Sequence, residues 1–262
     1  MIRRYKGDKT VEVRRSECTI LWGPRTRYGA TAMKATAAAT MQLALFDLDH
    51  TLLSGDSDVL WSDFLIGQGL LEASFRERSQ EMAARYAAGT IVPREYCDFY
   101  AGTLAGYDAT DLRPLRERFL RDVVRPRIPQ DARALLQRHR NAGETLVLTT
   151  ATNRAISELT ASDLGVDHYI CTELELIDGR YSGRTAGVLN MRAGKIDRLR
   201  QWLAEIGEPD RFLKEAAFYS DSINDLALLS VVRRPIVVDP DPRLESTALR
   251  KRWTVLRLNR GR

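Results

Sequence analysis

Four short polar groups stand out because each contains side chains that can bind metal ions or exchange protons. The groups DLDHT (47–51), TTATN (149–153) and DSIND (221–225) each follow an apolar stretch. The remaining group is Lys195, in the first turn of a predicted helix. A single Asp-x-Asp pair is usually a solvated turn, and Asp221 or Asp225 could cap a helix. The position of all four groups at the ends of predicted elements favours a common site.

The carboxylates of Asp47, Asp49 and Asp221 would form a cluster of like charges if these groups met. Such a cluster requires a cation, and oxygen ligands combined with phosphate oxygens favour Mg²⁺. Lys195 and the hydroxyl of Thr150 would supply hydrogen-bond donors for a phosphate group. One carboxylate can attack phosphorus while a second transfers a proton. These residue types therefore predict Mg²⁺-dependent chemistry on a phosphate ester.

The elements that must position these groups are predicted to alternate between strands and helices. Asp178-Gly179 predicts a hairpin within 173–185, and residues 58–128 predict helices only, for example 58–65 and 74–88. The alternation predicts an α/β fold with a doubly wound parallel sheet of Rossmann type, which binds ligands at the carboxyl ends of its strands. Strands are predicted at 43–46, 145–149, 166–171, 216–219, 236–238 and 253–258, and helices at 131–140, 153–164, 194–206, 226–229 and 243–250.

The motifs FDLDHTLL, TTATN, Lys195 and YSDSIND resemble, in this order, the four motifs of the haloacid dehalogenase superfamily of phosphohydrolases. The resemblance covers roughly residues 42–258. It implies a catalytic core over 41–57 and 129–262, and an inserted α-helical cap domain over 58–128 like that of the phosphoserine phosphatase branch. The segments GDSD, LVLTTATNR and YSDSINDLALL followed by VDPDPRL are also similar to a bacterial subgroup of histidinol-phosphate phosphatases.

The resemblance implies a role for each carboxylate of the first and fourth motifs. Asp47 would be the nucleophile and would form an aspartyl-phosphate. Asp49 would protonate the leaving alkoxide and then activate water. The side chains of Asp47 and Asp221, with the main-chain carbonyl of Asp49, would hold the Mg²⁺ ion.

The resemblance also implies a phosphate-binding set. Thr150, Lys195 and Asn224 would face the phosphoryl oxygens, and Asp225 would orient the lysine, water or metal from behind them. Serines replace both glycines of the usual GDGxND pattern in the fourth motif. This departure changes the shape of the backbone more than the chemistry, and it argues against an ordinary phosphoserine phosphatase rather than against a phosphatase.

Substrate selection is predicted to depend on the chain that leads into the helical region. Asp56 lies nine residues after Asp47. Phosphoserine phosphatases have a carboxylate near that place that binds the substrate ammonium, so the resemblance makes Asp56 a candidate amine-binding residue. Trp61 follows one turn later and could stack on an imidazole or an ammonium. Two alternatives stay open: Asp56 or Asp58 could cap the following helix, and Trp61 could be a packing residue.

Among phosphate esters we expect histidinol phosphate. Acidic residues and an aromatic ring suit an amine with a flat ring, and they would repel the carboxylate of phosphoserine. The first arginine after this entry is Arg76. A phosphoserine phosphatase or a broader small-molecule phosphatase is the alternative. A phosphotransferase on the same fold and an inactive binding module are the remaining classes.

The positive charge of the chain is concentrated near its N-terminus. The 262 residues carry a formal net charge of +5, with a pI of about 9.2. Residues 1–40 hold nine Lys/Arg against three Asp/Glu, so the remainder is close to neutral. A charge confined to one tail argues against a nucleic-acid partner. We interpret residues 1–40 as a basic, disordered leader that the fold does not need.

Composition excludes further classes. No apolar run approaches the roughly 20 residues that span a bilayer, so we expect no membrane partner. Three cysteines without a CxxC pair and three scattered histidines argue against a disulfide framework and a zinc site. The cysteine pattern favours a reducing, cytoplasmic location. The expected partner is a small-molecule phosphate ester, and the sequence does not indicate an oligomeric state.

Overall fold

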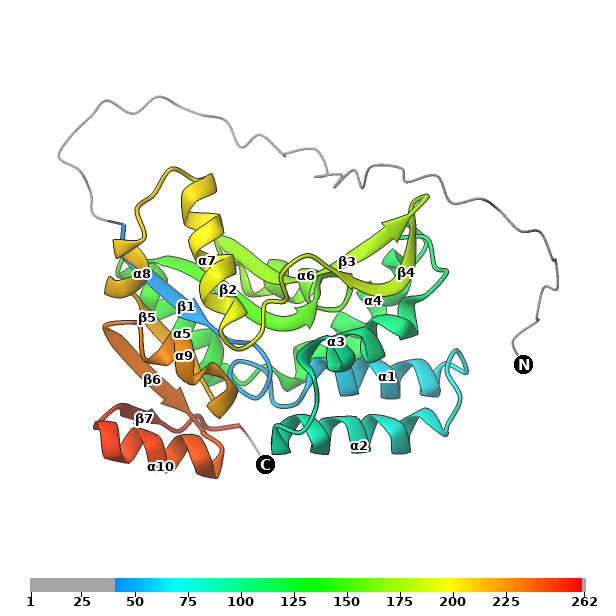
Figure 1. Cartoon of the computed structure of the whole chain (residues 1–262), viewed down its shortest axis with the longest axis horizontal. Helices are drawn as coiled ribbons and strands as arrows, with labels where there is room; N and C mark the ends of the chain where they lie inside the picture. The colour runs from blue at the N-terminus through cyan, green and yellow to red at the C-terminus, as the bar shows by residue number, and fades with distance from the viewer. Residues whose placement is uncertain (1–40, 261–262) are drawn as a thin grey trace. The chain divides into compact units, whose positions relative to one another are not determined.

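The computed structural model describes residues 41–260, which form a seven-stranded sheet with helices around it (Figure 1). The leader predicted over residues 1–40 lies outside the described residues, as do residues 261–262. The strand order is β4-β3-β2-β1-β5-β6-β7, and all neighbours are parallel except β3 and β4. The strands are β1 (Leu43–Phe46), β2 (Thr145–Asn153), β3 (His168–Ile177), β4 (Arg180–Ala186), β5 (Ala217–Ser220), β6 (Arg234–Val238) and β7 (Thr254–Leu256).

The central strand β1 explains why helices cover both faces of the sheet. All four of its residues are buried. Because successive side chains of a strand point to opposite faces, Ala44 and Phe46 join one hydrophobic core while Leu43 and Leu45 join another. The predicted doubly wound α/β fold is confirmed. The first core includes residues of α5 (Gln130–Asn141) and α6 (Arg154–Leu164), and the second includes residues of α7 (Gly194–Glu205), α8 (Arg211–Glu215), α9 (Leu226–Leu229) and α10 (Pro242–Lys251).

Residues 58–128 form helices, as predicted, and we call residues 56–128 the helical insertion. Helices α1 and α2 run side by side in it (Figure 1). Phe75, Tyr96 and Tyr100 belong to a cluster that also includes Met191 from outside the insertion, whereas Phe119 packs into the first core of the sheet. The elements are α1 (Ser57–Gly67), α2 (Phe75–Ala88), α3 (Pro93–Ala101), α4 (Arg113–Phe119), the short 3₁₀ turns η1 (Gly102–Leu104) and η3 (Arg125–Arg127), and the π-turn η2 (Leu120–Val124).

Strand β3 differs from the prediction because it is one long strand. The sequence predicts a strand at 166–171 and a separate hairpin over 173–185, but β3 is continuous, pairing first with β2 in parallel and then with β4 antiparallel. The hairpin turn is confirmed: Asp178 and Gly179 have φ values of 50° and 80°, as a type I′ turn requires. The amide of Thr185 in β4 donates to Asp98 of α3 at 2.8 Å, which fastens the hairpin to the helical insertion.

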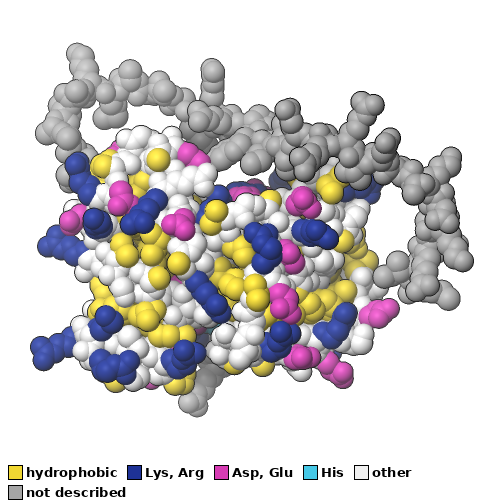
Figure 2. Space-filling view, viewed as in Figure 1, with side chains coloured by type: hydrophobic (Ala, Val, Ile, Leu, Met, Phe, Trp, Pro, Cys, Tyr) yellow, Lys and Arg dark blue, Asp and Glu magenta, His cyan; other side chains and the backbone are white. Residues whose placement is uncertain are grey.

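Charged side chains of both signs are interspersed over the face seen in Figure 2. This mixture fits the nearly neutral charge of the chain beyond residue 40. Across residues 41–260, none of the helices combines the length and the apolar character that a membrane span needs. The two described cysteines, Cys97 and Cys171, are buried and form no disulfide.

Candidate active site

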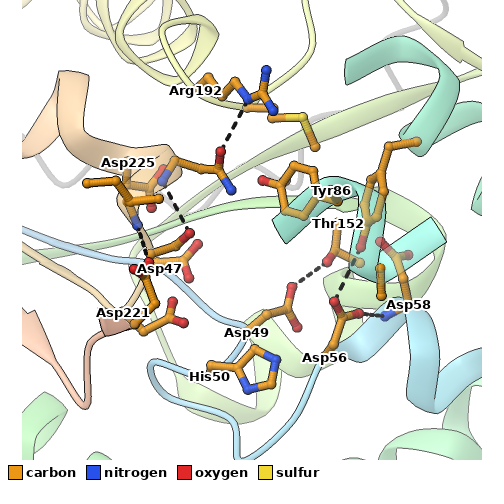
Figure 3. Close-up of a pocket in the computed structure, with 18 of the residues that line it drawn as sticks. Asp47, Asp49, His50, Asp56, Asp58, Tyr86, Thr152, Arg192, Asp221 and Asp225 are labelled. Carbon is orange, nitrogen blue, oxygen red and sulfur yellow. Dashed lines mark hydrogen bonds between the residues drawn. The ribbon is translucent and has the colours of Figure 1, made fainter. Parts of the chain in front are cut away.

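The carboxyl ends of β1, β2 and β5 open into a cavity of about 570 Å³ that the helical insertion also lines (Figure 3). This is the edge at which parallel α/β sheets bind ligands. All four predicted polar groups contribute to it. The sheet side supplies Asp47, Asp49, His50, Ala151, Thr152, Met191, Arg192, Lys195, residues 221–225, Asp241, Pro242 and Arg243, and the insertion side supplies Asp56, Asp58, Ala83, Tyr86 and Tyr96.

Lys195 connects the first and fourth groups. Its ammonium donates to Asp47 Oδ1 at 2.8 Å and to Asp225 Oδ2 at 2.7 Å, and the residue is only 2% exposed. Ser220 Oγ also donates to Asp225 Oδ2, at 2.8 Å. Charge-assisted hydrogen bonds are short and directional. Asp225 therefore orients Lys195, and Lys195 orients the carboxylate of Asp47.

A close backbone approach positions Lys195. Gly194 begins α7, and a Cβ atom added there would lie 2.2 Å from the main-chain oxygen of Leu189. Such a distance is far inside van der Waals contact, so only glycine fits without a shift of the backbone. The sequence marks this glycine as a helix start, but the close approach becomes visible only in the fold.

Burial and charge set the protonation of this group. Burial raises the pKa of Asp47 to about 7, although the Lys195 ammonium acts in the opposite direction. Burial alone would lower the pKa of Lys195, but Asp225 and Asp47 together raise it, so the lysine stays charged. Burial, then the charges of Asp47 and Asp225, raise the pKa of Asp221 well above its ordinary value. A further positive charge beside Asp47 and Asp221 would therefore stabilise their charged forms.

Thr51 lies between the two carboxylates predicted to bind metal. Its hydroxyl is 3.2 Å from Asp47 Oδ2 and 3.3 Å from Asp221 Oδ1, and it accepts the amide of Asp221 at 3.1 Å. Thr51 is completely buried. The sequence alone does not assign a role to Thr51, although the residue stands in the first polar group.

The carboxyl oxygens beside Thr51 fit a magnesium ion. The carboxyl groups of Asp47 and Asp221 both face Thr51, and both have raised pKa values that a bound cation would lower. Mg²⁺ is usually held by one or two carboxylates and completes its shell with water and phosphate oxygens. Within residues 41–260 no three His, Cys, Asp or Glu side chains are arranged to enclose an ion. The third predicted ligand is the main-chain carbonyl of Asp49.

Asp49 is held by a different set of partners from Asp47. The amide of Ser57, at the start of α1, donates to Asp49 Oδ1 at 2.7 Å. The hydroxyl of Thr152, near the end of β2, donates to Asp49 Oδ2 at 2.6 Å (Figure 3). The side chain of Asp49 is therefore fixed at the cavity wall without an ion pair.

Thr150, one of the predicted phosphate-binding residues, does not line the cavity. It is fully buried, and its hydroxyl accepts the amide of Thr152 at 3.2 Å. Strand β2 extends to Asn153, whereas the sequence predicts its end at residue 149. The residues of β2 that line the cavity therefore lie further along the chain than expected. Thr152 lines the cavity instead. The geometry therefore places Thr152 rather than Thr150 at the cavity wall, and a phosphate contact of Thr150 is not supported by its position.

Asn224 lines the cavity as predicted, and it contacts an arginine that the sequence did not single out. Arg192 Nε donates to Asn224 Oδ1 at 3.3 Å (Figure 3). The Arg192 guanidinium also lies 5.8 Å from the centroid of the Tyr86 ring in α2. Neither spacing nor periodicity identifies Arg192, because its place depends on the loop before α7.

The loop of the first polar group is held by a residue distant in sequence. Arg260 donates to the main-chain oxygens of Thr51 at 3.1 Å and Leu53 at 3.3 Å. Its Nε pairs with Asp239 at 2.8 Å. Asp239 lies in the VDPDPRL segment, so this segment supports the loop through Arg260.

Asp56 caps helix α1, which answers one question that the sequence left open. Its Oδ1 accepts the amides of Asp58 at 2.9 Å and Val59 at 3.1 Å, and Oδ2 accepts the Tyr96 hydroxyl at 3.3 Å. Burial, followed by the charge of Asp49, raises the pKa of Asp56 to about 6. Asp56 lines the cavity, but most of its carboxylate is occupied by the protein itself.

The predicted substrate contact of Trp61 is not supported. Trp61 is fully buried, does not line the cavity, and packs with its ring centroid 5.1 Å from Phe119. The helical period points Trp61 toward the core, which is the packing alternative. Two other aromatic residues do line the cavity: Tyr86 and Tyr96, whose stacked rings lie 4.4 Å apart between centroids.

Comparisons with known proteins find a matching family model and similar chains. The family model for haloacid dehalogenase-like hydrolases matches residues 44–230. A histidinol-phosphatase of Neisseria meningitidis is 39% identical over 216 residues, covering 82% of this chain and 97% of the relative. A phosphoserine phosphatase of Mycobacterium tuberculosis is 30% identical over 223 residues, covering 81% of this chain and 69% of the relative.

Solved structures show the same fold. A Bordetella pertussis protein of unknown function has 40% identity and a TM-score of 0.78, covering 83% of this chain and 99% of that one. A substrate-bound phosphoserine phosphatase has a TM-score of 0.62 at 15% identity, covering 84% of this chain and 94% of that one. The second likeness concerns the fold alone.

Proposed function

The chain belongs to the haloacid dehalogenase-like hydrolases, and we propose that it is a Mg²⁺-dependent phosphatase that acts on histidinol phosphate. That the chain is a phosphatase of this family follows from the family match and from its similarity to the histidinol-phosphatase of Neisseria meningitidis. The observation that carries the proposed mechanism is the contact of Lys195 with Asp47 and Asp225, beside a separately held Asp49.

Asp47 is the proposed nucleophile. Its carboxylate attacks phosphorus, the bond between phosphorus and the ester oxygen breaks, and an aspartyl-phosphate forms. Lys195 holds the carboxylate in place and offsets negative charge as the phosphate approaches. A bound Mg²⁺ would neutralise charge on the phosphate, with Asp47, Asp221 and the carbonyl of Asp49 as its proposed protein ligands.

Asp49 is the proposed acid and base. It gives its proton to the departing alkoxide, which leaves as the alcohol. It then takes a proton from water, and the hydroxide attacks phosphorus, releases phosphate and restores Asp47. The contacts from Thr152 and Ser57 hold Asp49 for both steps.

The side of the cavity lined by the helical insertion supports a nitrogen-containing substrate. It presents the carboxyl groups of Asp56 and Asp58 and the rings of Tyr86 and Tyr96. Acidic and aromatic groups together suit an ammonium and an imidazole. The relative named histidinol-phosphatase supports the same choice. A role in histidine biosynthesis and a cytoplasmic location stay predictions.

Phosphoserine is the second candidate substrate, and Arg192 is the observation that favours it. Arg192 lines the cavity, so a substrate carboxylate could pair with its guanidinium. The sequence places no arginine between Asp56 and Arg76, which argues against a substrate carboxylate. The fold supplies one, because Arg192 reaches the cavity from the loop before α7. A relative of the chain is also named phosphoserine phosphatase.

A substrate panel tests the proposed function. Phosphate release from histidinol phosphate, phosphoserine, a sugar phosphate and p-nitrophenyl phosphate is measured with Mg²⁺ and with a chelator. We expect kcat/KM to favour histidinol phosphate over phosphoserine by at least about tenfold, or about 1.4 kcal/mol. We also expect the chelator to abolish turnover. A preference for phosphoserine would overturn the substrate, and absence of turnover on every ester would overturn the phosphatase.

A further inference from the structure

The carboxyl group of Asp58 is the least satisfied polar group of the cavity. Asp58 lines the cavity and is 6% exposed. Its Oδ1 has no hydrogen-bond partner, and within residues 41–260 its side chain makes neither a hydrogen bond nor an ion pair. Buried polar atoms in folded proteins are normally paired, because an unpaired one costs free energy. An unpaired carboxyl group on a residue that lines a ligand cavity indicates that a bound ligand supplies the missing hydrogen-bond donor.

The neighbouring Asp56 provides an internal comparison. It accepts three hydrogen bonds from Asp58, Val59 and Tyr96, and it is the residue that caps α1. Asp58 is not needed for capping, because its own amide is one of the groups that Asp56 binds. The open acceptors on this side of the cavity therefore belong to Asp58. This distinction is invisible in the sequence, where either residue could be the cap.

The surroundings of Asp58 favour a positively charged group. Burial, followed by the negative charges of Asp56 and Asp49, raises the pKa of Asp58 well above its ordinary value. A cation placed beside it would remove this penalty. The stacked rings of Tyr86 and Tyr96 line the same cavity and present surfaces on which a flat or cationic group can rest.

We propose that Asp58 accepts a hydrogen bond from the cationic nitrogen of the substrate and is the main residue that selects nitrogen-bearing phosphate esters. This inference rests on the proposed function, because it takes the occupant of the cavity to be such an ester. It also moves the amine-binding role from Asp56, where the sequence placed it, to the residue with free acceptors.

The test measures the dissociation constant of histidinol by calorimetry, which needs neither turnover nor a phosphate. Asp58→Asn keeps the size of the side chain and removes its charge, and we expect it to weaken histidinol binding at least tenfold. Asp56→Asn keeps a helix-capping acceptor, and we expect a smaller loss. Asp63→Asn, an exposed acid on the same helix paired with Arg76, is the matched control and is expected to bind like wild type.

Thermal unfolding separates this role from a structural one. Removing an unpaired buried carboxyl is expected to leave the melting temperature of Asp58→Asn unchanged or raised, whereas a residue needed for the fold would lower it. Asp58→Ala serves as a second variant with the same expectation for binding.

Three outcomes would overturn the inference: wild type that does not bind histidinol, Asp58 variants within threefold of wild type, or a larger loss in Asp56→Asn than in Asp58→Asn. The proposed function is judged separately by hydrolysis of histidinol phosphate with the same preparation. If that ester is not hydrolysed while histidinol binding still depends on Asp58, the substrate assignment fails and the inference stands.

Discussion

Asp47 and Asp49 are two residues apart, yet their carboxyl groups have different partners. Lys195 donates to Asp47, whereas a backbone amide and the hydroxyl of Thr152 donate to Asp49. An ammonium partner favours the charged form that a nucleophile needs. Asp49 accepts from neutral donors instead, so the two carboxyl groups have different surroundings for the different roles proposed for them.

Asp47→Asn is expected to abolish turnover, because an amide cannot form the acyl-phosphate. Loss of the covalent route should lower kcat on the order of 10³-fold or more. Steady-state phosphate release from p-nitrophenyl phosphate measures the effect. A variant that keeps more than a tenth of wild-type activity would contradict the nucleophilic role.

Asp49→Asn should lower kcat while keeping metal affinity, because the proposed metal ligand is the main-chain carbonyl. Loss of general acid–base catalysis typically costs about 10²- to 10⁴-fold. Mg²⁺ affinity is measured by calorimetry and kcat by phosphate release. Turnover equal to wild type would show that Asp49 is not the acid.

Asp56 should make stability depend on pH. Burial, then the charge of Asp49, raises its folded-state pKa to about 6, against about 3.9 in an unfolded chain. Because the folded value is higher, its favourable contribution is complete below about pH 4 and is lost as pH rises through about 6. The uncharged Asp56→Asn should therefore gain stability relative to wild type between these values. Urea unfolding with chelator present measures this gain, and a difference that stays flat with pH would contradict the raised pKa.

At the scale of elements, the local sequence pattern was enough to predict a strand or turn where a single type of residue signal was strong. The apolar run Leu43–Phe46 predicted β1 with its observed bounds. Asp178-Gly179 predicted the hairpin turn because few other residue pairs accept two positive φ angles. The length of β3 was not predictable, because its second half is a strand through pairing with β4.

Burial explains why the sequence did not identify every residue of the site correctly. Trp61 and Thr150 have suitable chemistry, but tertiary packing buries both away from the cavity. Thr152 and Arg192 reach the cavity because of where β2 ends and where the loop before α7 passes. Sequence motifs identify residue types at element ends, whereas the register of those ends depends on the whole sheet.

Gly194→Ala tests how far α7 can shift without disturbing Lys195. The added Cβ would lie 2.2 Å from the Leu189 oxygen, so we expect a loss of about 1–3 kcal/mol in unfolding free energy and a lower kcat. Gly67→Ala is the matched control, since a Cβ at Gly67 meets no atom within 4 Å. Urea unfolding and phosphate release are measured on both, and equal behaviour would show that the backbone at Gly194 adapts freely.

At the scale of the molecule, residues 41–260 contain the sheet, the helical insertion and the cavity. Strand β1 begins at Leu43 and pairs with β2 and β5, both within this part. We therefore expect deletion of residues 1–40 to leave kcat and the melting temperature close to those of the full chain. An insoluble product, or one that loses most of its kcat, would show that residues 1–40 belong to the fold.

The segment from Asp47 to Asp58 joins β1 to the first turn of α1 without interruption. It carries the proposed nucleophile, the proposed proton donor, the residue that caps the helix and the carboxylate proposed to recognise nitrogen. A short run of codons thus encodes four of the proposed roles, whereas Lys195, Asp221 and Asp225 come from later in the chain. A recombination breakpoint outside residues 47–58 would therefore leave these four proposed roles together.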